Sequence, residues 1–189
     1  MFPGNNILHS DQKACRAAFV TLCLTVLLCS ACEDRLPSSW NSDPVPADSL
    51  ADNAFVLDGN GYKGGVFNLS PHSARAYYFS DDAMTSILNA DNIIGPQGRP
   101  LSVVVHITVP GDESGSFPWA NALVSPTAKS KIRISIDDEE YVSIRGATQI
   151  FMFSDISARR VRGSYSGIIE NSSGKQLILS DGRFDGSFF

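Results

Sequence analysis

Few residues of this 189-residue chain combine a reactive side chain with the spacing that a chemical site requires. A zinc site needs three or four ligands. Beyond the N-terminal region the chain offers two histidines, His72 and His106, with no third ligand spaced to join them. The G-x-S-x-G turn that carries the nucleophile of an α/β-hydrolase is also missing. We therefore interpret both histidines as surface residues.

Acidic residues offer candidates for calcium binding and for sugar hydrolysis. The run Asp137–Glu140 lacks the alternating ligand positions of an EF-hand loop, and Asp58–Gly61 is followed by Tyr62 where a further oxygen ligand belongs. We interpret both stretches as turns. Carboxylates that could pair across a cleft to hydrolyse a sugar are Asp81, Asp82, Asp112 and Glu113. Any acidic protein offers such pairs, so we predict no enzyme, no metal and no cofactor.

All four cysteines lie in the first 32 residues, as Cys15, Cys23, Cys29 and Cys32. They accompany an apolar run, 17–28, which follows the cations Lys13 and Arg16 and precedes small residues. This order is typical of a secretory signal peptide, which we predict over residues 1–31. The exported domain then keeps Cys32 alone, so we expect no internal disulfide, no thiolate metal site and no cysteine nucleophile.

The residues before Cys32 resemble a bacterial lipobox. Ser30 and Ala31 have the small side chains found at its last two positions, while Cys29 stands where an aliphatic residue is usual. The resemblance implies that diacylglycerol is attached to the thiol of Cys32, that the chain is cut before this residue, and that the new amine receives a fatty acid such as palmitate. The alternatives are an ordinary signal cut after Ala31 and an uncleaved anchor helix, which needs roughly 20 apolar residues.

The segment after the signal and the charge of the chain limit the partners. Residues 32–53 carry three prolines among Ser, Asp and Asn, with little apolar periodicity, and we predict a flexible tether. The chain has 15 Lys and Arg against 20 Asp and Glu, a net charge of −5, without a basic stripe. This charge argues against nucleic acid as a partner. We expect membrane contact through the N-terminal lipid alone.

From Ala54 onward the hydrophobic period changes to two, which is typical of strands. The clearest strand, 101–109, places its apolar odd-numbered residues on one face, and 131–137 does the same with three isoleucines. The pattern over 54–189 predicts about nine or ten short strands, linked mostly by hairpins. We predict an all-β fold with a single antiparallel β-sandwich, and a lipocalin-like barrel is the alternative.

The same pattern leads to local expectations. Residues 82–88 fit a short helix, because Met84, Ile87 and Leu88 have helical spacing. The strand expected at 148–153 is apolar on both faces, which is typical of a strand covered on both sides. A turn is expected at 181–182 between two strands. In the last of these, Phe184 is expected to face the core and Arg183 to point away.

The C-terminal half resembles small lipoproteins of Gram-negative bacteria. The similarity extends over 115–189 and lies in the motifs VRGSYSG (161–167), NSSGK (171–175) and DGRF (181–184). It implies a secreted, β-sandwich-like domain with no established activity. Together with the lipobox it implies a protein anchored in the cell envelope, at the outer membrane of a Gram-negative bacterium.

Two loop aromatics, Phe117 and Trp119, are the candidates for ligand contact, because a ring on a loop can stack on a sugar or anchor a protein. The alternative is that Trp119 plugs one end of the domain. We therefore predict a lipid-anchored envelope protein with a non-catalytic binding or scaffolding domain, whose partner is a carbohydrate or an envelope protein. The alternatives are a carrier of a small apolar ligand and a carbohydrate-active enzyme or accessory module.

Overall fold

The computed structural model describes residues 50–71, 73–154 and 159–189. Within these ranges the chain forms ten strands and no helix, which confirms the all-β prediction. The strands are β1 (Ala54–Gly59), β2 (Tyr62–Asn68), β3 (Ala74–Phe79), β4 (Met84–Ile94), β5 (Pro100–Pro110), β6 (Gly115–Pro118), β7 (Lys131–Ile136), β8 (Glu139–Ser154), β9 (Arg159–Asn171) and β10 (Gln176–Phe188).

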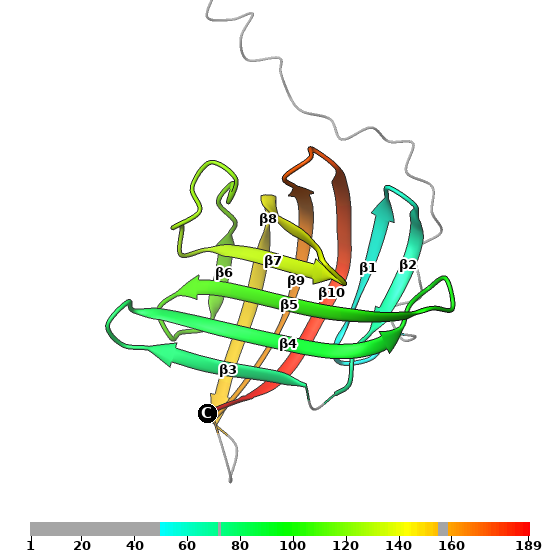
Figure 1. The fold of residues 1–189 in the computed structure, drawn as a ribbon. Helices are drawn as coiled ribbons and strands as arrows, with labels where there is room; N and C mark the ends of the chain where they lie inside the picture. Colours follow the sequence, from blue (N-terminus) through cyan, green and yellow to red (C-terminus); the bar gives the residue numbers. More distant parts are fainter. Residues whose placement is uncertain (1–49, 72, 155–158) are drawn as a thin grey trace, which may run out of the picture. The chain divides into compact units, whose positions relative to one another are not determined.

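Seven strands form a closed barrel in the order β3, β4, β5, β7, β8, β9 and β10 (Figure 1). Neighbours are antiparallel except at the seam, where Ser187 and Phe188 of β10 pair in parallel with Arg75 and Ala76 of β3. β1 and β2 extend from β10, and β6 pairs with β8. The predicted sandwich is wrong, and a barrel, the alternative, is the observed architecture.

Long, bent strands explain why the sandwich prediction failed. β8, β9 and β10 span 16, 13 and 13 residues, where the sequence pattern suggested shorter strands separated by turns. The turn expected at 181–182 is a bulge within β10, since Asp181 has a φ of 52° and the pairing with β9 shifts there. A bulge bends a strand without ending it. One edge of β10 can therefore pair first with β1 and then with β3, which closes the ring.

The helix expected over 82–88 is instead part of strand β4. Its three apolar residues divide between two faces, because Ile87 is buried while Leu88 and Met84 point to the other side. The β-branched Thr85 and Ile87 favour a strand. Pairing with β5 along the whole of β4 outweighs the helical spacing of three residues.

Alternating side chains fill the interior of the barrel. The odd-numbered residues 101–109 and the three isoleucines of β7 are buried as predicted, and they belong to one hydrophobic cluster. Phe184 is also buried, as expected, with its ring stacked 6.3 Å from that of Tyr165. In contrast, Phe151 on β8 is 60% exposed. The segment 148–153, expected to be covered on both sides, therefore has one face in solvent.

Aromatic rings in the core lie against glycines of neighbouring strands. A Cβ atom at Gly146 would come within 2.6 Å of the Trp119 ring, and one at Gly182 within 2.3 Å of the Tyr165 ring. Large and small residues thus alternate across the interior, as they must in a small barrel that is filled by side chains. These glycines determine where the two rings can sit.

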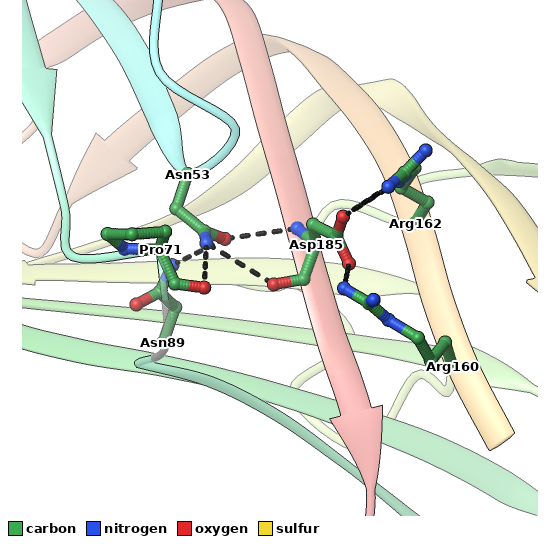
Figure 2. A network of polar contacts seen from close by, with 6 residues as sticks. All are labelled: Asn53, Pro71, Asn89, Arg160, Arg162 and Asp185. Atoms are coloured by element: carbon green, nitrogen blue, oxygen red, sulfur yellow. Dashed lines mark hydrogen bonds and ion pairs between the residues drawn. The ribbon is translucent and has the colours of Figure 1, made fainter. Parts of the chain in front are cut away.

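A buried polar network ties the residue before β1 to the seam of the barrel (Figure 2). Asn53 is fully buried, and its Nδ2 donates to the carbonyl oxygens of Pro71 at 3.0 Å and Asp185 at 3.2 Å. Its Oδ1 accepts from the Asp185 backbone N–H and from Asn89 Nδ2, both at 3.1 Å. One side chain thereby joins β4, β10 and the segment after β2.

The Asp185 carboxylate extends this network to β9 (Figure 2). Its side chain is 7% exposed and accepts hydrogen bonds from Arg160 Nη2 at 2.7 Å and Arg162 Nε at 2.8 Å. A buried carboxylate needs such partners, because an unpaired charge is costly away from water.

Ordered packing begins before Ala54, where the sequence analysis placed the start of the domain. Leu50 is buried and packs with Ala54 and Val56, and Asn53 is buried in the network at the seam. Both Leu50 and Asn53 had been assigned to the tether, 32–53. Their burial makes them part of the folded structure.

Candidate functional site

The residues proposed from sequence as site residues do not assemble into one site. Cys32 lies outside the described residues. Trp119 is 7% exposed, and its Nε1 donates to Thr148 Oγ1 at 2.7 Å. Phe117 is partly buried and packs against the same core. The Trp119 ring therefore fills the barrel, as its alternative interpretation held, and is not available to stack on a ligand.

A cavity on the outer face of the barrel brings polar and charged side chains together. Its volume is about 370 Å³, which lies in the range of small-molecule sites. We call it the outer-wall pocket. It is formed by β4, β5, β7, the β3–β4 turn and the loop 119–130, and its lining is Asp82, Met84, His106, Thr108, Thr127, Ala128, Lys129, Lys131 and Arg133.

The loop over the outer-wall pocket is held against the barrel at several points. At its start, Trp119 is anchored in the core. Lys131 Nζ donates to the carbonyl oxygen of Pro126, and Lys129 Nζ donates to the carbonyl oxygen of Asp82. These contacts give the pocket a preformed wall, which reduces the entropy lost when a ligand binds.

The imidazole of His106 and the hydroxyl of Thr108 line the pocket from strand β5. Ser86 Oγ lies 2.7 Å from His106 Nε2. Thr108, the next outward residue of β5, is 4% exposed, and its hydroxyl has no hydrogen-bond partner among the described residues. Leaving a buried hydroxyl unpaired costs about 1–3 kcal/mol. Burial, then Arg133 and Lys131, lowers the pKa of His106 from 6.5, so the ring is mostly neutral at pH 7.

Positive charge dominates the pocket. Lys129, Lys131 and Arg133 supply three cations, against the carboxylate of Asp82. Arg133 also pairs with Glu140 at 3.5 Å, whereas no carboxylate of the described residues forms an ion pair with either lysine. Burial and the nearby Arg133 lower the pKa of Lys131. The local charge is thus opposite in sign to the net charge of the chain, −5.

The Ser86–His106 pair differs from a hydrolytic triad. Across the strand pairings, His106 faces Leu88 of β4 and Arg133 of β7. Within the described parts of the chain its ring is hydrogen-bonded to Ser86 and to no carboxylate of the kind that orients a catalytic histidine. Ser86 lies inside a regular strand, not on the strained turn that exposes a nucleophile. The pair is better suited to hydrogen-bonding a ligand than to attacking one.

Several of the acidic candidates pair with cations, among them Asp112 with Arg159 and Glu139 with Lys175. Asp137 Oδ1 accepts from the backbone N–H of Ser102 at 3.0 Å, and its Oδ2 pairs with Arg99 at 3.2 Å. The described residues contain no group of three or more potential metal ligands. No helix in these parts of the chain has the length and apolar character needed to cross a membrane. His72 lies outside the described residues.

Sequence reasoning treated the pocket residues of β5 and β7 as ordinary outward positions of separate strands, and it placed Asp82 and Met84 in a helix. Their proximity follows from the pairing of β5 with β7, which sets His106 opposite Arg133 and Thr108 opposite Lys131. The signal present in the sequence is a basic run, 129–133, in an acidic chain. That run alone does not show which histidine or threonine lies beside it.

Comparisons with known proteins do not assign this chain to a family. A scan against protein-family models found no match, and neither the curated proteins nor the solved structures contained one.

Proposed function

We propose that this protein is a lipid-anchored component of the cell envelope whose barrel binds a small ligand in the outer-wall pocket without transforming it. The observation that carries the proposal is the pocket itself, a preformed cavity with an unpaired buried hydroxyl at Thr108 and two lysines that lack a carboxylate partner among the described residues. Groups of this kind are satisfied when a ligand supplies their partners.

The pocket supports binding on the outside of the barrel over binding inside it. The inward residues of β5 and β7 are buried aliphatic side chains in one continuous cluster. A lipocalin-like carrier would need an enclosed space at these positions, and a ligand there would displace core side chains. A carbohydrate-active enzyme is less favoured because the Ser86–His106 pair has no orienting carboxylate in its strand register.

The proposed anchor is the lipid on Cys32, and the support for it is the signal pattern of residues 1–31. In a Gram-negative host supplied with labelled palmitate, Cys32→Ser should accumulate as precursor without label. Cys29→Ser is the matched control and should still be processed and labelled. Equal labelling of Cys32→Ser and the parent would refute the proposal that Cys32 carries the lipid anchor.

Ligand binding at the pocket is tested with a variant that fills it. Ala128 lines the pocket from the loop, and Ala128→Phe should occlude it. Val124 lies in the same loop and is 78% exposed, so Val124→Phe is the matched control. In a screen of charged and uncharged small molecules, we expect NMR shifts of the His106 ring that Ala128→Phe abolishes and Val124→Phe retains. Shifts that survive Ala128→Phe would place the ligand elsewhere.

A further inference from the structure

We infer that the outer-wall pocket recognises an anionic oxygen group, a phosphate or a carboxylate, carried on a small organic molecule. The inference rests on the proposed function and names the ligand class of the same pocket. The ligand class follows from the cationic side chains of the pocket, from the unpaired hydroxyl of Thr108 beside them, and from the volume of the pocket.

Two lysines present ammonium groups whose charge is not neutralised by a carboxylate of the described residues. Each ammonium has three N–H donors. Lys129 and Lys131 each use one of them on a backbone carbonyl, that of Asp82 and that of Pro126. These contacts hold the ammonium groups at the pocket and leave further donors for a ligand. An anion is the ligand that both pairs with the charge and accepts from these donors.

Four outward side chains form a square on the strand pair β5–β7. His106 lies opposite Arg133, and Thr108 lies opposite Lys131. Directly paired residues have Cβ atoms about 4.5–5.5 Å apart, and all four side chains line the same pocket. The buried Thr108 hydroxyl, which has no partner among the described residues, can donate to an oxyanion there. Hydrogen bonds to an ionised acceptor are the stronger kind.

The remaining space suits a molecule larger than a bare ion. The pocket volume of about 370 Å³ is that of a site for small organic molecules. Met84 and Ala128 add apolar lining, and the Asp82 carboxylate lies on the side of the β3–β4 turn. Asp82 disfavours a second negative charge and can accept from a ligand hydroxyl. The lining therefore fits one anionic group on a small polar or mixed body.

The test is calorimetric titration of the purified full-length chain in detergent with glycerol 3-phosphate, the monocarboxylate glycerate and uncharged glycerol. We expect at least one anion to bind and glycerol not to bind; the two anions separate phosphate from carboxylate recognition. Lys131→Met removes the charge and should weaken binding about tenfold. Lys63→Met, at an exposed position of β2, is the control and should leave binding unchanged.

Thr108→Val provides an independent readout, because it replaces the unpaired hydroxyl with a methyl group of similar shape. It should weaken anion binding and raise the Tm of the free protein, whereas a hydroxyl with a structural role would lower the Tm on removal. Anion binding unaffected by both Lys131→Met and Thr108→Val would overturn the inference. Glycerol that shifts the His106 signals while neither anion does would overturn the anionic class and leave the proposed binding function standing. Failure of all three probes would overturn the inference, and the Ala128→Phe screen then decides the proposed function.

Discussion

Replacement of Asn53 by alanine should greatly lower the free energy of unfolding of this barrel, although the residue lies in a segment whose sequence resembles a linker. Asn53 is fully buried and makes four hydrogen bonds at the seam (Figure 2). Asn53→Ala removes all four and leaves the partner groups on Pro71, Asn89 and Asp185 without their bonds to this side chain.

The magnitude follows from the number of bonds. A typical intramolecular hydrogen bond contributes about 1 kcal/mol net, and a buried group left unsatisfied costs about 1–3 kcal/mol. Four bonds therefore give a loss of about 4 kcal/mol, against a total stability of about 5–15 kcal/mol for a domain of this kind. With a urea dependence of about 2 kcal/mol per molar, the midpoint should fall by roughly 2 M.

Urea unfolding followed by tryptophan fluorescence measures this shift, since Trp119 is buried in the core. Asp52→Ala changes the exposed neighbour and should move the midpoint by little. Asn53→Leu restores the volume without the hydrogen bonds and should remain destabilised. If Asn53→Leu matched the parent, packing volume would explain the burial of Asn53, and the hydrogen-bond reasoning would be refuted.

Three further predictions concern the core, the glycines and pH. Phe184→Ala should cost about 3–5 kcal/mol in urea unfolding, while Arg183→Ala, on the opposite face, should have little effect; equal effects would contradict the assigned facing of β10. Gly146→Ala should lower the free energy of unfolding far more than Gly111→Ala, because a Cβ at Gly146 would lie 2.3 Å from a backbone oxygen, while a Cβ at Gly111 would meet nothing within 4 Å. Both glycines have positive φ. Similar losses of stability in the two variants would show that backbone strain, and not the close contact, determines the effect. The pKa of His106 is lower in the folded protein than in the unfolded chain, so the unfolded chain binds more protons than the folded one as the pH falls through about 6.5, and this residue reduces stability on acidification. His106→Gln should therefore flatten the decline of the urea midpoint between pH 7.5 and 5. An unchanged slope would contradict the burial of the ring.

Local sequence patterns predicted a strand or a turn correctly where a single signal, such as period-two alternation or a glycine-rich turn, was present without a competing one. The alternation at 101–109 and in the isoleucines of β7 placed the inward faces correctly, because one face of each strand is buried. The turn at 58–61 was also predicted, and Gly59, Asn60 and Gly61 do adopt positive φ where β1 returns as β2. The helix expected over 82–88 failed because three apolar residues at helical spacing carry less weight than pairing with a whole neighbouring strand.

Barrel closure lay beyond the sequence pattern because it depends on where long strands bend. The bulge at Asp181 and the predicted turn at 181–182 involve the same residues, an aspartate and a glycine. Either structure accommodates the positive φ of Asp181. Only the uninterrupted partner strand β9 decides that the chain continues as β10. The difference between a sandwich and a barrel therefore rests on one pairing of distant segments, β10 with β3.

The candidate site shows the same limit at the level of side chains. A loop tryptophan beside a phenylalanine fits a ligand platform and a core plug equally well by type. Trp119 is a plug because Gly146 and Gly167, on neighbouring strands, leave room for its ring. Conversely, Thr108 and Lys131 follow the rule for solvent-facing strand positions, and they become a pocket only because the loop 119–130 folds back over them. Outward polar residues of β5 and β7 form a binding pocket only where another segment covers them. Here that segment is the loop 119–130, whose sequence has no regular periodicity that would predict its position.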